Sequence, residues 1–430
     1  MTIEQLYSYF EQCTSVTTDS RVCPEGSLFF ALKGESFDGN KFALSALEKG
    51  CRYAVVDDAQ YAIDARFLLV NNVLEALQQL AKMHRQRIKT PVIGITGTNG
   101  KTTTKELIAT VLSQKFNTIY TQGNLNNHIG VPLTLLQLTS AHEMAVVEMG
   151  ANHLGEIETL VNLACPEFGI ITNVGKAHLE GFGSFEGVIR TKGELYDYIS
   201  VTGGTLFVNL DNPILNELSV AIPRYGYGLQ SSDGLIQGRV TGCSPFLELA
   251  WQASGNPTEY TVATHLIGEY NAENVLAAIC IGLHFGVLPA QINVALSNYK
   301  PTNNRSQFQK TARNQLIIDA YNANPTSMTA SLNNFRHVMA DKKAVILGDM
   351  FELGEQSDEE HRKIVGLLKE ASFDKVLLVG ERLSAIPSDF EKFGATVDLI
   401  DYLEKHPLSG YTILVKGSHG MRLDKSVEKL

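Results

Sequence analysis

Residues 91–106, which read PVIGITGTNGKTTTKE, constrain the fold more than any other stretch of the chain. The apolar run Val92, Ile93 and Ile95 after Pro91 is typical of a short buried strand. Beyond it, apolar residues recur at the helical positions 107, 108, 111 and 112. A strand, a glycine-rich turn and a helix in this order can surround a phosphate with backbone N–H groups at the positive end of the helix dipole.

The turn also supplies the side chains that a nucleotide phosphate needs. Lys101 adds a full positive charge, and a hydroxyl at Thr102 is the usual first magnesium ligand of such a loop. The strict pattern G-x-x-x-x-G-K-[ST] is not met, because its first glycine would fall on Ile95. The strand–loop–helix context nevertheless favours a phosphate loop over a glycine turn with its lysine in solvent. Its members are Gly97, Thr98, Asn99, Gly100, Lys101, Thr102 and Thr103.

Composition excludes several classes of protein. A chain of 430 residues is expected to hold about two to four domains, and 44% hydrophobic with 19% charged residues is typical of a soluble globular protein. The net charge of −10, without a basic block, argues against a nucleic-acid partner. No apolar run approaches the ~20 residues that span a bilayer. Six scattered cysteines without a C-x-x-C pair and no leader pattern predict a cytoplasmic, reduced protein.

The first 88 residues predict a small α/β domain. We expect strands at 27–32, 53–56 and 67–70 and helices at 2–12, 41–48 and 73–87. The tetrapeptide Thr18-Asp19-Ser20-Arg21 could bind a ligand or merely form a polar turn. Residues 84–89 are basic and polar, and we interpret them as a hinge to the next domain.

In the central region, residues 89–301, apolar strands end on polar residues. The strands 144–147, 168–171 and 205–208 run into Glu148, Thr172-Asn173 and Asn209. Ligands bind beyond the carboxyl ends of parallel strands, so these side chains should gather around the phosphate loop. Glu148 is suited to Mg²⁺, although a helix cap or a surface carboxylate is the alternative.

Three other residues of this region have two interpretations each, and a fourth, Lys192, has one. His178 lies in a glycine-rich loop just past a strand end, where it could contact a metal or phosphate or be structural. Lys192 has the local spacing of an ordinary surface lysine. Asn271 and Asn274 share a face near the start of a helix expected at 270–283, where they could contact adenine or serve as caps.

Residues 302–430, which follow a polar linker at 299–304, predict a separate parallel sheet with crossover helices. Strands are expected at 316–318, 344–347, 376–379, 397–400 and 412–415, and helices at 328–339, 358–371 and 382–393. The strand ends are again polar, at Asp319, Asp349 and Lys416. The absence of G-x-G-x-x-G argues against a dinucleotide site. The linker could allow this domain to close on the phosphate loop and exclude water.

Together these segments resemble the Mur ligase family. The resemblance covers the whole chain and rests on motifs that follow the expected strands and helices. Besides the loop at 94–103, they are Gly123-Asn-Leu-Asn-Asn127, Gly130-Val-Pro-Leu-Thr134, Glu148-Met-Gly-Ala-Asn152, Asn173-Val-Gly-x-Ala-His178, Asn271-x-x-Asn274 with Leu276-Ala-Ala, Asp319-Ala-Tyr-Asn-Ala-Asn-Pro-Thr-Ser-Met328, Gly348-Asp-Met-x-Glu-Leu-Gly354 and Lys416-Gly-Ser-x-Gly-Met-Arg422.

The resemblance implies an α/β protein of three domains. These are a small N-terminal domain (1–88) for a UDP-muramoyl substrate, a central P-loop ATPase domain (89–301) with a mostly parallel sheet, and a C-terminal Rossmann-like domain (302–430). The implied activity is ATP-driven amide ligation in peptidoglycan synthesis. The motifs are most similar to those of the member that joins D-alanyl-D-alanine to UDP-N-acetylmuramoyl-tripeptide through an acyl phosphate, and a monomer is expected.

The resemblance also implies roles for individual residues. Lys101 and the loop would hold ATP phosphates, Thr102 and Glu148 a first Mg²⁺, and His178 with a carbamylated Lys192 a second. Asn271 and Asn274 would contact adenine, and Arg305 and Asp319 would contact phosphate and ribose. The residues implied for substrate binding are Thr18, Asp19, Ser20, Arg21, Lys33, Asn126, Asn127, Asn322, Asn324 and Lys416.

Two alternatives remain. A sister Mur ligase or a folylpolyglutamate synthetase would share the loop and the domain plan, but the sister that adds diaminopimelate has an Asp-Asn-Pro-Arg box that Asn324-Pro325-Thr326 does not match. A P-loop switch or motor would use ATP only to change shape. Phosphate release with and without D-alanyl-D-alanine would distinguish this second class.

Overall fold

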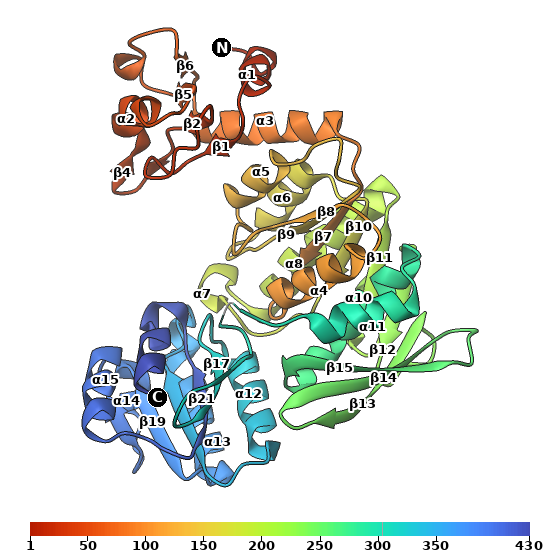
Figure 1. The fold of residues 1–430 in the computed structure, drawn as a ribbon, viewed down its shortest axis with the longest axis vertical. Helices are drawn as coiled ribbons and strands as arrows, with labels where there is room; N and C mark the ends of the chain where they lie inside the picture. Colours follow the sequence, from red (N-terminus) through yellow and green to blue (C-terminus); the bar gives the residue numbers. More distant parts are fainter. Residues whose placement is uncertain (303) are drawn as a thin grey trace.

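The computed structural model describes residues 1–302 and 304–430; Asn303 of the predicted linker lies outside the described residues. Three larger sheets follow one another along the chain, and Figure 1 shows them as three bodies in a row. The α/β class with mostly parallel sheets is confirmed. The domain boundaries after residues 88 and 301 remain predictions.

The first body contains a four-stranded parallel sheet in the order β1-β2-β5-β6. Its strands are β1 (Val16–Thr17), β2 (Leu28–Phe30), β5 (Tyr53–Val56) and β6 (Phe67–Leu69), with a hairpin of β3 (Lys33–Gly34) and β4 (Phe37–Asp38). Its helices are α1 (Ile3–Phe10), α2 (Ala43–Glu48) and α3 (Val73–Arg87), so the expected helix at 73–87 is confirmed.

The junction to the second body corrects the expectation of a polar hinge at 84–89. His84 and Arg85, at the end of α3, are buried. The His84 ring joins the Tyr7 hydroxyl at 2.9 Å to the Leu138 carbonyl at 2.8 Å. Arg85 donates to the Ala164 carbonyl at 2.9 Å. These basic side chains therefore satisfy buried carbonyls, and the apolar core continues from α1 through α3 into the second body.

The second body contains a nine-stranded sheet in the order β15-β14-β13-β12-β11-β10-β7-β9-β8. The strands are β7 (Val92–Thr96), β8 (Thr118–Tyr120), β9 (Met144–Glu148), β10 (Phe168–Ile171), β11 (Thr205–Asn209), β12 (Arg224–Gly228), β13 (Ile236–Cys243), β14 (Phe246–Ala253) and β15 (Glu259–Ile267). Neighbouring strands are parallel except at β13–β14–β15, an antiparallel extension that the sequence analysis missed.

Helices cover both faces of this sheet, and α4 and α10 pack together beside the phosphate loop. The helices are α4 (Lys101–Leu112), α5 (Gly130–Leu135), α6 (Glu156–Ala164), α7 (Leu179–Phe182), α8 (Phe185–Thr202), α9 (Pro213–Leu218), α10 (Ala272–His284) and α11 (Pro289–Asn298). A 3₁₀ turn, η3 (Glu269–Asn271), leads into α10.

The third body contains a six-stranded sheet in the order β16-β17-β21-β18-β19-β20, parallel except at β16. Its strands are β16 (Gln307–Lys310), β17 (Gln315–Asp319), β18 (Lys343–Gly348), β19 (Lys375–Val379), β20 (Glu391–Phe393) and β21 (Thr412–Lys416). Its helices are α12 (Pro325–His337), α13 (Ser357–Ala371), α14 (Glu381–Ala385) and α15 (Thr396–Lys405), with a turn η4 (Gly354–Gln356) before α13.

Two expectations for this body are wrong. The predicted strand 397–400 belongs to helix α15: Leu399 and Leu403, four residues apart, are buried, whereas Val397 is 61% exposed. The apolar run at 397–400 is too short for its period to distinguish a strand from one face of a helix. The predicted helix 382–393 stops in α14, because Pro387 cannot continue it, and the chain then forms β20.

Candidate functional site

The phosphate loop connects β7 to α4, as predicted. Gly97 and Gly100 have φ values of +145° and +78°, which favour glycine. A Cβ atom on Gly97 would lie 2.0 Å from the Thr172 hydroxyl. The loop therefore approaches the end of β10 more closely than any other residue type would allow.

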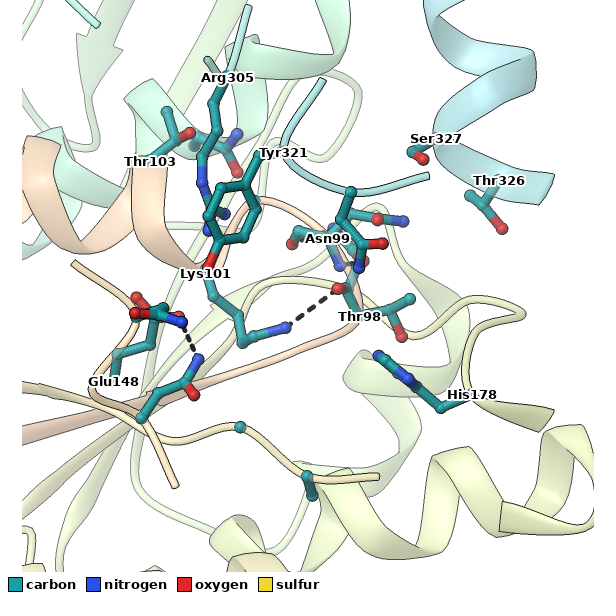
Figure 2. Close-up of a pocket in the computed structure, with 18 of the residues that line it drawn as sticks. Thr98, Asn99, Lys101, Thr103, Glu148, His178, Arg305, Tyr321, Thr326 and Ser327 are labelled. Atoms are coloured by element: carbon teal, nitrogen blue, oxygen red, sulfur yellow. Dashed lines mark hydrogen bonds between the residues drawn. The ribbon is translucent and has the colours of Figure 1, made fainter. Parts of the chain in front are cut away.

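Lys101 bends back over this loop. Its Nζ atom donates to the carbonyls of Gly97 at 2.7 Å and Thr98 at 3.1 Å. Figure 2 shows the bond to Thr98. Burial lowers the pKa of Lys101 to about 8, although the Glu148 carboxylate opposes this shift. Neutral carbonyls are weaker partners for an ammonium than phosphate oxygens, so an anion in the loop would attract this side chain.

Glu148 is 1% exposed and is surrounded by donors, which excludes a surface carboxylate. Its carboxylate accepts from the Thr102 hydroxyl at 2.9 Å and from the Asn126 amide at 2.8 Å. The ammonium of Lys105 lies 3.4 Å away. Sequence analysis missed Lys105, because a lysine one helical turn beyond Lys101 gives no local signal that it is buried.

Thr102 and Glu148 fit a magnesium site, because both offer oxygen ligands beside the phosphate loop. Within residues 1–302 and 304–430, no three His, Cys, Asp or Glu side chains converge as a protein-only metal site would require. Mg²⁺ usually keeps several waters and is held by one or two carboxylates together with substrate phosphates, so it needs few protein ligands.

Lys192, on α8, is 2% exposed, so its interpretation as a surface lysine is wrong. Its Nζ atom contacts only one hydrogen-bond acceptor among the described residues, the Ala151 carbonyl, at 3.4 Å. Burial, together with the nearby charge of Lys101, lowers the pKa of Lys192 to about 7. A large fraction of this side chain is therefore a neutral amine at neutral pH.

His178 precedes α7 and points toward the third body. Its Nδ1 atom forms an ion-pair contact with the carboxylate of Glu352, which the sequence analysis did not identify as a site residue. The contact with His178 lowers the pKa of Glu352. A second pair across the same junction joins Lys176 to Glu360 at 3.5 Å. The carboxyl-end loops of the two sheets therefore face each other.

A cavity of about 830 Å³ lies between the phosphate loop and the third body. Figure 2 shows Lys101, Glu148, His178, Arg305 and Tyr321 converging on it. The cavity is large enough for a nucleotide and part of a second substrate. Its walls include these predicted site residues: Thr98, Asn99, Gly100, Lys101, Thr103, Asn126, Asn127, Glu148, His178, Asn271, Asn274, Arg305, Asp319, Asn322 and Lys416.

The two asparagines at the start of α10 are buried and bonded to each other, with a 2.9 Å bond from the Asn274 amide to Asn271 Oδ1. Asn274 Oδ1 accepts from the Thr104 hydroxyl at 2.9 Å, and Asn271 Nδ2 donates to the Ile267 carbonyl at 2.8 Å. Neither side chain caps the helix. Their amides are thus fixed in orientation at the cavity wall.

Residues of the third body complete the wall. The Asp319 carboxylate accepts from Lys416 at 2.6 Å and from Ser331 at 3.1 Å. The guanidinium of Arg305 stacks on Tyr321, 3.7 Å from the ring centroid. Sequence analysis missed Ser331 and Tyr321, because their neighbours become apparent only when the sheet is assembled.

Two asparagines of the cavity wall bond to neighbours in the chain, whereas Asn324 bonds across the junction. Asn127 Oδ1 accepts from the Gly130 amide at 2.9 Å and shapes the turn before α5. Asn322 Oδ1 accepts from the Ala323 amide at 2.8 Å. Asn324 Nδ2 donates to Asn99 across the junction at 2.8 Å.

A second group of predicted residues lies at the carboxyl end of the first sheet. Asp19 and Arg21 form an ion pair of 2.7 Å just beyond β1, and Lys33 pairs with Asp57 at 2.8 Å just beyond β2 and β5. The Ser20 carbonyl accepts from Lys49 at 2.7 Å. Thr18 precedes this turn and is half-buried. The structure thus brings these residues to one edge, in a group separate from the cavity wall.

Comparisons with known proteins agree with this geometry. Three family descriptions match in chain order: the Mur ligase family catalytic domain at residues 12–85, the Mur ligase middle domain at 95–282 and the glutamate ligase domain of Mur ligases at 304–419. UDP-N-acetylmuramoyl-tripeptide–D-alanyl-D-alanine ligase from Escherichia coli K12 is 37% identical, over 97% of this chain and 93% of its own length.

Two solved structures are similar over nearly the full length. MurF from Acinetobacter baumannii has a TM-score of 0.87 at 31% identity, with 100% of this chain and 98% of that chain covered. MurF from Thermotoga maritima, in complex with ADP, has a TM-score of 0.85 at 26% identity, with 98% and 97% covered.

Proposed function

Because the chain belongs to the Mur ligase family, we propose that it joins D-alanyl-D-alanine to UDP-N-acetylmuramoyl-tripeptide in a reaction driven by ATP. The product is the UDP-muramoyl-pentapeptide of peptidoglycan synthesis. The observation that most supports this function is a single cavity with the phosphate loop and Lys101 on one side and Asp319, Asn322 and Lys416 of the third body on the other.

The use of ATP is supported by the loop geometry and by the ADP in the Thermotoga relative. Lys101 holds its ammonium against the loop carbonyls and could neutralise charge on the transferred phosphoryl group. Asn271 and Asn274 present rigid amides where a base could lie. Mg²⁺ would be held by Thr102 and Glu148, and when bound it would neutralise phosphate charge.

The proposed chemistry has two steps. A carboxylate oxygen of the tripeptide attacks the γ-phosphorus, the bond to the β,γ-bridging oxygen breaks, and an acyl phosphate and ADP result. The amine of D-alanyl-D-alanine then attacks the acyl carbon, loses a proton, and expels phosphate as the amide forms. The chain itself mainly positions the reactants and excludes water, which would otherwise hydrolyse the acyl phosphate.

The first body is proposed to bind the UDP end of the muramoyl substrate. Its cationic side chains, Arg21 and Lys33, stand at the carboxyl edge of a parallel sheet, where ligands of α/β proteins bind. Carbamylation of Lys192 is proposed as well, because burial favours the neutral amine, which is the form that reacts with CO₂. The carbamate would supply an oxygen ligand near His178. A cytoplasmic, monomeric enzyme remains our expectation.

Incubation with ATP, UDP-N-acetylmuramoyl-tripeptide and D-alanyl-D-alanine tests the proposal, with mass detection of the pentapeptide nucleotide. We expect one pentapeptide and one phosphate per ATP consumed, and no product with Lys101→Ala. Glutamate or diaminopimelate, offered with the correspondingly shorter nucleotide, tests a sister ligase. Phosphate release that is equally fast without D-alanyl-D-alanine would support a switch or motor instead.

Described residues 1–302 and 304–430 contain no helix that is both long and apolar enough to cross a membrane.

A further inference from the structure

We propose that Glu352 of the third domain is a positioning residue that orients His178 toward a divalent metal ion, so that docking of the third domain completes the metal site. This inference rests on the proposed ATP-dependent ligation. It assigns a role to the motif Gly348-Asp-Met-x-Glu-Leu-Gly354, which the mechanism above does not use.

In the described part of the chain, the His178 ring has a carboxylate partner on one nitrogen only. Among the ion pairs of the described residues, His178 has one partner, the Glu352 carboxylate, and the contact is through Nδ1. The ring therefore has its Nε2 atom available for another ligand. A histidine that binds a metal through one nitrogen almost always donates its other N–H to a carboxylate, a backbone carbonyl or a water.

The backbone around Glu352 holds this residue in a specific conformation. This residue has a φ value of +63°, which is uncommon for a residue other than glycine. The neighbouring amides are anchored: Met350 N donates to His361 at 3.0 Å, and Phe351 N donates to Ser418 at 3.0 Å. Leu353, on the other side, is buried. The loop thus holds Glu352 in an unfavourable conformation that aims its carboxylate across the domain junction.

The His178–Glu352 pair contributes little to the stability of the fold. The Glu352 side chain is 55% exposed, and exposed ion pairs contribute about 0–1 kcal/mol to folding. An ion pair this exposed would therefore add little to the stability of the interface between the two domains. Orienting the His178 ring for a metal ion needs no large stabilisation, because the Glu352 carboxylate only has to favour one ring position and one tautomer.

Other contacts around the His178–Glu352 pair also join the second and third bodies. Helix α7, which follows His178, contacts η4, which follows Glu352. Lys176 and Glu360 form the second pair across the junction. Because the two partners belong to different domains, separation of the domains would release the His178 ring. Metal binding at this position and domain docking should therefore be coupled.

Mn²⁺ binding to the full chain tests the inference without the ligation reaction. Free Mn²⁺ is measured by electron paramagnetic resonance in the presence of ADP. The Mn²⁺ binding that is present in the wild type and lost in His178→Ala is the part that depends on this ring. We expect Glu352→Gln to lower the affinity for this His178-dependent Mn²⁺ by about 10- to 100-fold, which is the usual effect of removing a hydrogen-bond partner of a metal-binding histidine. Glu355→Gln, at an exposed position on the same loop, is the matched control and should bind as wild type does.

The double variant separates positioning from a merely structural effect. If Glu352 acts through His178, Glu352→Gln should have no further effect on Mn²⁺ binding in the His178→Ala background. Circular dichroism melting should give the same Tm for Glu352→Gln and Glu355→Gln. Unchanged Mn²⁺ affinity in Glu352→Gln, no His178-dependent Mn²⁺ in wild type, or independent effects in the double variant would each overturn the inference. A wild-type chain that fails to make pentapeptide would instead contradict the proposed function.

Discussion

Asn324 of the third domain donates a 2.8 Å hydrogen bond from Nδ2 to Oδ1 of Asn99 in the phosphate loop. The amide of Asn324 is held in this orientation because its Oδ1 atom accepts from Ser327 N at 2.9 Å and caps helix α12. Asn99 N in turn donates to Asn173 Oδ1 at 2.9 Å. A row of three asparagines therefore connects the end of β10, the phosphate loop and the start of α12.

Replacement of Asn324 by serine should slow ligation without unfolding the chain. Serine keeps a capping oxygen for α12 but is too short to reach Asn99. Loss of one hydrogen bond of about 0.5–1.5 kcal/mol predicts a roughly 2- to 12-fold fall in kcat/KM for ATP. Steady-state kinetics with saturating cosubstrates measures this, and the Tm should change little. Asn99→Ala combined with Asn324→Ser provides the control: fully additive losses would contradict a direct coupling of the two side chains.

Lys101→Ala should nearly abolish ligation. No neighbouring loop residue can replace its ammonium, and the loss of one preorganised group at a charged transition state costs about 3–4 kcal/mol, or 10²–10³ in kcat. Lys115→Ala is the matched control, because Lys115 donates to the Phe285 carbonyl near the far end of α4, away from the loop. Pentapeptide formation measures kcat. A Lys101→Ala enzyme with more than about a tenth of the wild-type kcat would contradict the assignment.

The phosphate loop and the polar residues that follow β9 and β10 could be predicted from sequence because their signals are local. The apolar period changes from strand to helix around Lys101, and parallel strands bring their carboxyl ends together whatever their order. Glu148 and Asn173 were therefore correctly expected near the loop. Their partners in the third domain, by contrast, depend on how two sheets dock.

Features that depend on assembly were missed for a physical reason. Lys192 looks like any helix lysine in sequence, and it is buried because α8 packs against both α6 and the sheet. Glu352 faces His178 across a domain junction that no local pattern encodes. In the same way, a run such as 397–400 is too short to distinguish a strand from a buried helix face.

Asp19→Ala or Arg21→Ala should raise KM for the muramoyl nucleotide and leave KM for ATP nearly unchanged, because both residues lie at the edge of the first sheet. Loss of a charge-assisted hydrogen bond of about 1.5–3 kcal/mol predicts an increase of roughly 10- to 150-fold. The matched control is the equivalent pair Asp64 and Arg66, also 2.7 Å apart, before β6. Initial rates at limiting nucleotide measure the effect. Wild-type KM values in both variants would rule out this binding site.

Stability should fall in mild acid through His84. Burial lowers the pKa of His84 below its ordinary value near 6.5, so the unfolded chain binds the proton more tightly than the folded one. The free energy of unfolding therefore decreases as the pH falls below about 6.5 and stops changing below the folded pKa. Urea unfolding at pH 7.5 and 5.5 measures the difference, and His84→Gln should reduce it. An equal pH dependence in both proteins would exclude His84 as the cause.

Carboxylic acids should partly restore activity to Lys192→Ala. A free ammonium at Lys192 would repel Mg²⁺, whereas a carbamate offers an oxygen ligand, and its formation needs the neutral amine that a pKa of about 7 provides. Acetate or formate can enter the space vacated by the side chain and supply a carboxylate. Lys192→Arg should not be rescued comparably, because its bulk and permanent charge remain. Ligation rates with and without added acetate measure the rescue. Full activity of Lys192→Ala in CO₂-depleted buffer, without added acid, would show that no carbamate is needed.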